Sequence, residues 1–149
     1  MTPRELSGPS VLAKLALIER LLRQLDGLGE ISQDRLDSDD VVRLALERIL
    51  TQLVETASSL NWHLGASVGE VPVTGAYKDS FNAAASAGAI PDELAQRLRP
   101  SAGLRNVLIH NYLAVDWGIV VASAPKMATD YRDYVRSVAQ WLTGLGVVG

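Results

Sequence analysis

Cysteine is absent from the 149-residue sequence, and aromatic residues make up only 5% of it. Without cysteine, the chain can form neither a disulfide framework nor a cysteine-based zinc site. No apolar stretch reaches the roughly 18 residues that a membrane-spanning helix needs, and the first residues lack the apolar core of a signal peptide. These absences predict a cytoplasmic protein with no membrane partner.

An excess of positive charge is missing as well. The sequence has 14 Lys and Arg residues against 17 Asp and Glu residues, which gives a net charge of −3. This balance argues against a protein that grips long nucleic acid through a broad basic face. It does not exclude a nuclease that acts at one local site. Arg97, Arg99 and Arg105 lie close enough in sequence to form a small positively charged surface, a positive mouth, at such a site.

Hydrophobic residues make up 48% of the sequence and recur with the spacing of amphipathic helices. The stripes predict helices over about 10–26, 38–60, 77–88, 91–100 and 127–145, with a loop rich in glycine between 65 and 76. Pro100 is expected to break or kink its helix, because proline lacks the N–H that a helix interior needs. We therefore predict a single all-α domain over residues 1–149, an antiparallel bundle of four to five helices that acts as a homodimer.

The most informative segment runs from 104 to 112, where Arg105, Asn106, His110 and Tyr112 occupy fixed offsets in an apolar, helix-forming run. Arginine stays charged and offers a planar fork of donors suited to phosphate. Histidine titrates near neutrality and can both take and give a proton. RNA carries its own nucleophile, the 2′-hydroxyl. An Arg and a His are therefore nearly sufficient to catalyse its cleavage without a metal ion. No metal site and no cofactor are predicted, because the two histidines have no nearby acidic pair.

Helix geometry complicates this pairing. Arg105 and His110 are five residues apart, which on a regular helix places them about 140° apart around the axis. They converge only if the arginine wraps around the helix, the helix is distorted, or a second copy of the chain contributes. We favour a site at a dimer interface. The same geometry puts Arg105 and Tyr112 on nearly one line of the helix.

The pattern Arg-Asn-x-x-x-His-x-Tyr resembles the signature of HepT-type toxins in the HEPN superfamily. Weaker matches at corresponding positions of the family pattern extend the resemblance over about residues 40–120. These matches are Arg43 with Glu47, Tyr77 with Phe81, and Asp116. The resemblance implies an all-α homodimer with ribonuclease activity, in which Arg105 and His110 are catalytic and Asn106 supports the site. It further implies a partner, a minimal nucleotidyltransferase antitoxin that adenylylates Tyr112 and so neutralises the toxin.

Plainer interpretations stand beside these. Arg43 and Glu47 form an i, i+4 pair that is often only a solvated helix face, and a role at an interface or in supporting the site is the alternative. Tyr77 is read as a core or interface aromatic, and His63 as structural. For the whole protein, one alternative is a non-catalytic HEPN module that binds a nucleotide or a partner. Another is a helical dimerisation domain in which the motif merely packs.

Overall fold

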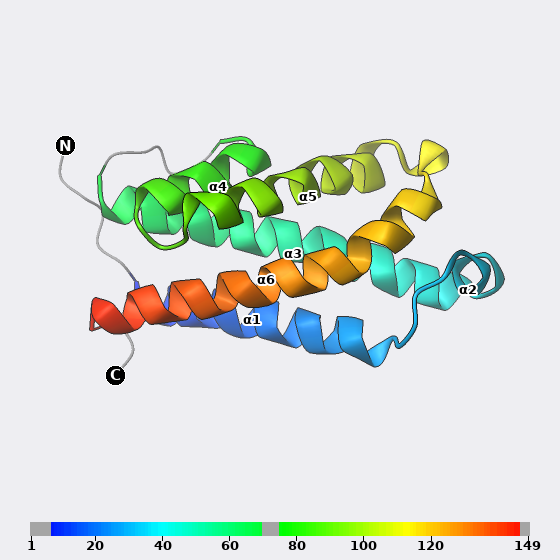
Figure 1. Cartoon of the computed structure of the whole chain (residues 1–149), viewed down its shortest axis with the longest axis horizontal. Coiled ribbons are helices and arrows are strands. Elements are labelled where there is room, and N and C mark those ends of the chain that lie inside the picture. Colours follow the sequence, from blue (N-terminus) through cyan, green and yellow to red (C-terminus); the bar gives the residue numbers. More distant parts are fainter. Residues whose placement is uncertain (1–6, 70–74, 147–149) are drawn as a thin grey trace.

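The structure, a computed structural model, describes residues 7–69 and 75–146, and this part of the chain is helical throughout with no strand. Figure 1 shows the long helices running along the long axis of the molecule. The elements are α1 (Gly8–Gly27), α2 (Gln33–Ser38), α3 (Asp40–Ser67), α4 (Tyr77–Ser86), α5 (Asp92–His110), the 3-10 helix η1 (Tyr112–Ala114) and α6 (Trp117–Gly144). The predicted all-α fold is confirmed, and the six-residue α2 is an element that the hydrophobic stripes did not predict.

Side-chain caps decide where two of the longest helices begin. Asp39 accepts hydrogen bonds from the backbone N–H groups of Val41 and Val42, and so starts α3. Asp116 does the same for the N–H groups of Gly118 and Ile119. Its cap places the start of α6 at Trp117, ten residues before the stripe that predicted the last helix. The predicted start of this helix near residue 127 is therefore wrong.

Proline does not break the helix that carries the motif. α5 runs without interruption from Asp92 to His110 with Pro100 inside it, so the predicted break is wrong. An interior proline costs a helix about 3 kcal/mol because one hydrogen bond is lost and the ring crowds the preceding turn. The buried face of α5 offsets this cost through Leu94, Leu98, Ala102 and Leu108, each at most 3% exposed. The motif is thus joined rigidly to the body of the bundle.

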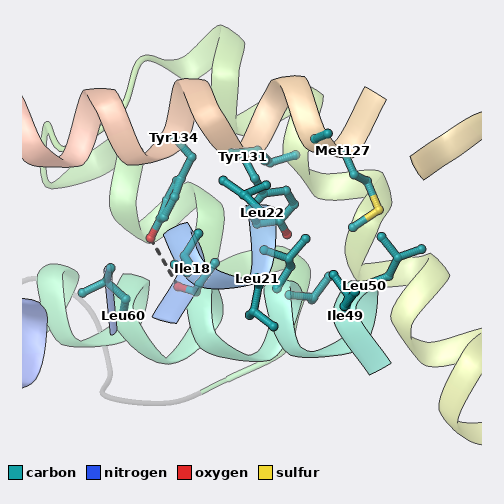
Figure 2. Packing of buried hydrophobic residues seen from close by; sticks show 14 of the residues in the cluster. Ile18, Leu21, Leu22, Ile49, Leu50, Leu60, Met127, Tyr131 and Tyr134 are labelled. Atoms are coloured by element: carbon teal, nitrogen blue, oxygen red, sulfur yellow. Dashed lines mark hydrogen bonds between the residues drawn. The ribbon is translucent and has the colours of Figure 1, made fainter. Parts of the chain in front are cut away.

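The core is a single apolar cluster to which all six α-helices contribute, α2 through Leu36 alone. Figure 2 shows Met127, Tyr131 and Tyr134 of α6 pointing toward leucine and isoleucine side chains of α1 and α3. Tyr131, Tyr134 and Phe81 contact one another edge-on or tilted, with ring centroids 6.2–6.5 Å apart. Tyr131 and Tyr134 are both 0% exposed and form the centre of the core.

α3 is the central element, packed against α1, α2, α4 and α5. In Figure 1 the end of α5, η1 and the start of α6 lie at the same end of the bundle as α2 and the start of α3. None of the helices in the described part is long and apolar enough to cross a membrane. The fold therefore presents the Arg105–Tyr112 segment at one end of a rigid helical body.

Candidate functional site

The motif is divided between two elements. α5 ends at His110, and Asn111, with φ −125° and ψ 38°, caps it outside the helical region. Tyr112 begins η1 and does not continue the helix. The prediction that Arg105 and Tyr112 lie on one line of a helix is therefore wrong. Its physical basis was a regular helix through residue 112, which the turn at Asn111 prevents.

Arg105 is held by a carboxylate of another helix. Its Nη2 and Nε donate hydrogen bonds of 2.9 and 3.2 Å to the same oxygen, Oε1, of Glu55 in α3. The side chain of Arg105 is only 12% exposed and that of Glu55 is 33% exposed, so solvent screens this ion pair only in part. The pair fixes one edge of the guanidinium against α3.

Two further residues complete the surroundings of the guanidinium. The ring of Tyr77, the first residue of α4, lies 4.4 Å from Cζ of Arg105, which is a cation–π contact. Asn106 accepts a 3.2 Å hydrogen bond from Nη1 through its Oδ1. Three of the five guanidinium N–H donors are thus engaged within the protein. The other two donors make no hydrogen bond within residues 7–69 and 75–146.

His110 does not join this cluster. It is exposed at the end of α5, and its side chain makes no hydrogen bond or ion pair within residues 7–69 and 75–146. An exposed histidine without protein partners is no structural core residue. Within one copy of the chain, Arg105 therefore contacts Asn106, Tyr77 and Glu55, and the described residues show no hydrogen bond or ion pair between His110 and this cluster.

Arg97 does not supply a free positive charge to the predicted positive surface beside the motif. Arg97 is paired with three carboxylates, at 2.7 Å with Glu93, 2.6 Å with Asp130 and 3.2 Å with Asp133. The hydrogen bonds to Glu93 and then to Asp130 raise the pKa of Arg97. Since Asp130 is on α6, this network ties α5 to α6 and has a structural role. The sequence alone suggested that the charge of Arg97 was free, but carboxylates on its own helix and on α6 pair with it.

The predicted pair of Arg43 and Glu47 is also not formed. Arg43 makes its salt bridge with Asp40 at 3.1 Å, and its Cζ lies 5.9 Å from the centroid of the Trp117 ring. These contacts join the start of α3 to the start of α6. Glu47 makes no hydrogen bond or ion pair in the described part of the chain, and its role as interface or support stays a prediction. His63 accepts a hydrogen bond from the backbone of Ser7 at its Nε2, which agrees with a structural histidine.

Tyr112 is 63% exposed, as its proposed modification requires. Its neighbour Leu113 is 91% exposed, and Ile119 at the start of α6 is 57% exposed. Exposed large apolar side chains at one end of a bundle are typical of a surface that meets another protein. This surface lies at the same end of the bundle as the end of α5.

Glu55 is the site residue that sequence reasoning missed. It lies 50 positions from Arg105, so no local spacing links the two. One signal was available, because Glu55 is the only charged residue between Arg48 and His63. A lone carboxylate in such a helical stretch indicates a specific partner. Among the residues that the structure describes, no group of three or more acidic or histidine side chains is placed to hold a metal ion.

Comparison with known proteins assigns the chain to a family. The family model described as ribonuclease HepT-like matches residues 15–138. The chain belongs to the HepT-like ribonuclease family. This HepT-like chain is 30% identical over 135 residues to the tRNA nuclease HepT of Aphanizomenon flos-aquae, covering 89% of each chain. It is 25% identical over 128 residues to the mRNA nuclease HepT of Shewanella oneidensis, covering 84% of this chain and 92% of the relative.

Solved structures share the fold of this HepT-like chain. One is the tri-AMPylated HEPN toxin of Shewanella oneidensis in complex with its MNT antitoxin, with a TM-score of 0.78 and 19% identity over 88% of this chain and 97% of that one. Another is YutE of Bacillus subtilis, a cytosolic protein of unknown function, with a TM-score of 0.76 and 20% identity over 93% of both chains. At these identities the likeness concerns the fold alone.

Proposed function

We propose that this protein is a metal-independent endoribonuclease toxin that works in the cytoplasm and cleaves RNA with Arg105 and His110. The observation that carries the proposal is the state of Arg105, which is 12% exposed and has two N–H donors without a hydrogen bond in the described part of the chain. A guanidinium anchored on one edge and one face is preorganised to stabilise the charge that develops on a phosphate. The names of the relatives, tRNA and mRNA nucleases, support the same class of substrate.

The reaction uses the nucleophile of the substrate. The 2′-oxygen attacks the adjacent phosphorus while His110 removes its proton, the bond from phosphorus to the 5′-oxygen breaks, and the protonated His110 returns the proton to the leaving 5′-oxygen. Arg105 holds the charged phosphorane, and Asn106 supports the guanidinium. The products are an RNA ending in a 2′,3′-cyclic phosphate and an RNA beginning with a 5′-hydroxyl.

The offset of five residues between Arg105 and His110, about 140° around a regular helix, favours a site shared by two copies of the chain. In a homodimer, Arg105 of one copy meets the exposed His110 of the other. Mixing inactive Arg105→Ala with inactive His110→Ala tests this directly. If half of the dimers are mixed and each mixed dimer has one intact site, about a quarter of the wild-type rate returns. No recovery after verified subunit exchange would show that both residues act from the same chain.

We further propose that a minimal nucleotidyltransferase antitoxin neutralises the protein by transferring AMP to the hydroxyl of Tyr112. The exposure of Tyr112 and the AMPylated, antitoxin-bound state of a structural neighbour support this. The phosphodiester would bring a negative charge and a bulky adenosine to the end of α5. A non-catalytic module that only binds a nucleotide or partner is the alternative.

The test of the activity is cleavage of single-stranded RNA by the purified protein in EDTA. We expect cleavage by the wild type and none by His110→Ala, whose helical circular dichroism should be unchanged because His110 is exposed. Activity that disappears with chelator and returns with magnesium would contradict the metal-independent mechanism. If the wild type and His110→Ala both fail to cleave any RNA, the binding module becomes the better account.

A further inference from the structure

A chain of buried hydrogen bonds joins three helices beneath the Arg105 site. The hydroxyl of Tyr134 in α6 donates to Oδ1 of Asn61 in α3 at 2.6 Å. Nδ2 of Asn61 donates to Oγ of Ser80 in α4 at 3.2 Å, and this hydroxyl donates to the backbone oxygen of Tyr77 at 2.7 Å. Asn61, Ser80 and Tyr134 are all 0% exposed. A polar chain in an apolar core is costly unless every member is satisfied, and this one is satisfied along its length.

The last link of this chain fixes the first turn of α4. Ala76, the residue before α4, has no side chain that can cap the helix. The turn is anchored instead through Ser80, whose hydroxyl connects the backbone of Tyr77 to α3. The Tyr77 backbone therefore has a defined place relative to α3. Since Tyr77 begins the helix, its ring is carried at the end of α4 that reaches Arg105.

Tyr77 and Glu55 then hold the same guanidinium from two directions. Glu55 takes the edge formed by Nε and Nη2, and the ring of Tyr77 covers a face at 4.4 Å. Asn106 accepts a further hydrogen bond from Nη1. Hydrogen bonds at the edges still allow the guanidinium plane to tilt, whereas a ring on the face holds the plane. The ring therefore adds to these hydrogen bonds in fixing where the remaining donors point.

We propose that Tyr77 is a positioning residue for Arg105 in RNA cleavage, and that the Tyr134–Asn61–Ser80 chain holds it in place. This inference rests on the proposed ribonuclease function. The aromatic ring is the active feature of Tyr77, because the ring covers the cation. Phenylalanine therefore preserves the function, and a side chain of similar bulk without a π-system does not.

Two substitutions separate these features. Tyr77→Phe keeps kcat within about twofold of wild type, whereas Tyr77→Leu lowers kcat about tenfold and changes KM by less than about threefold. The effect falls on kcat because a misdirected guanidinium still attracts RNA but stabilises the transition state less well. Ser80→Ala, which frees the first turn of α4, lowers kcat in the same direction by a smaller factor.

The control is Trp141→Leu, which removes another half-buried aromatic ring, packed against the core from α6 and not in contact with Arg105. It should change the unfolding midpoint without changing the rate of cleavage by folded protein. An independent readout is the ¹H–¹⁵N signal of Nε–Hε of Arg105, assigned with Arg105→Lys. The ring shifts this proton upfield in the wild type and in Tyr77→Phe, and Tyr77→Leu removes the shift.

The outcomes distinguish this inference from the proposed function. If Arg105→Ala cleaves RNA as well as the wild type, the proposed function fails. If Arg105→Ala is inactive while folded Tyr77→Leu keeps wild-type kcat, or if Tyr77→Phe loses as much as Tyr77→Leu, the positioning role of the ring is refuted. An Arg105 signal that is identical in wild type and Tyr77→Leu also overturns it, and this measurement needs no cleavage.

Discussion

Replacing Glu55 by alanine removes the carboxylate that anchors Arg105, and we expect it to reduce both stability and activity. The two hydrogen bonds of 2.9 and 3.2 Å join side chains that are 12% and 33% exposed. Fully exposed ion pairs contribute about 0.2–1 kcal/mol, and breaking a fully buried pair costs about 3–5 kcal/mol. A pair between these extremes should cost about 1–2 kcal/mol in free energy of unfolding. For a chain of this length, that lowers the melting temperature by about 2–8 °C.

The effect on cleavage should exceed the effect on folding. With Glu55 absent, only the Tyr77 ring and one hydrogen bond to Asn106 hold the guanidinium, so we expect kcat to fall about tenfold or more at a temperature where the variant is folded. Glu55→Gln should lose less, because an amide oxygen still accepts a hydrogen bond. The assay combines thermal unfolding with single-turnover cleavage of the same RNA. A folded Glu55→Ala variant with unchanged kcat, or with increased kcat, would refute the idea that Glu55 orients Arg105.

The other predictions concern the body of the bundle and the modified tyrosine. Arg97→Ala should lower the unfolding midpoint without changing kcat, because it leaves Asp130, whose side chain is 7% exposed, without its partner. Burial raises the pKa values of Tyr131 and Tyr134 above their ordinary value of 10. The unfolded state loses these protons first, so stability in guanidinium melts should fall as the pH rises above about 10 and should fall less steeply in Tyr131→Phe. Co-expression with the nucleotidyltransferase should add AMP to the wild type, seen by intact mass, and not to Tyr112→Phe. AMP that persists on that variant would place the modification elsewhere.

Much of the fold follows from hydrophobic periodicity, and the misses have physical causes. The stripe from Val11 to Leu25 predicts α1 closely, because every member faces one core. α2 was missed since six residues contain less than two turns of pattern. The sequence pattern did not predict the first ten residues of α6, because they show no distinct polar face and include Pro125. They are helical because Asp116 caps the helix and because they pack against the bundle.

The candidate site divides in the same way. Local sequence identifies Arg105, Asn106, His110 and Tyr112, because their spacing is itself the signal. It cannot supply Glu55, which meets Arg105 only when α3 and α5 are packed together. Nor can it show that Arg97 is neutralised by Asp130 and Asp133 across the helix interface. The ion pairs between helices depend on how the helices pack, and this packing cannot be read from the spacing of residues in the sequence.

The central claim is that Arg105 and His110 promote attack by the 2′-hydroxyl of RNA. The most direct measurement is mass spectrometry of the products formed in EDTA from one RNA and from the same RNA with a 2′-deoxy nucleotide at the cleaved position. The account predicts a 2′,3′-cyclic phosphate and a 5′-hydroxyl from the first substrate, and no cleavage at that position in the second. Products with a 3′-hydroxyl and a 5′-phosphate, or equal cleavage of the deoxy substrate, would contradict it.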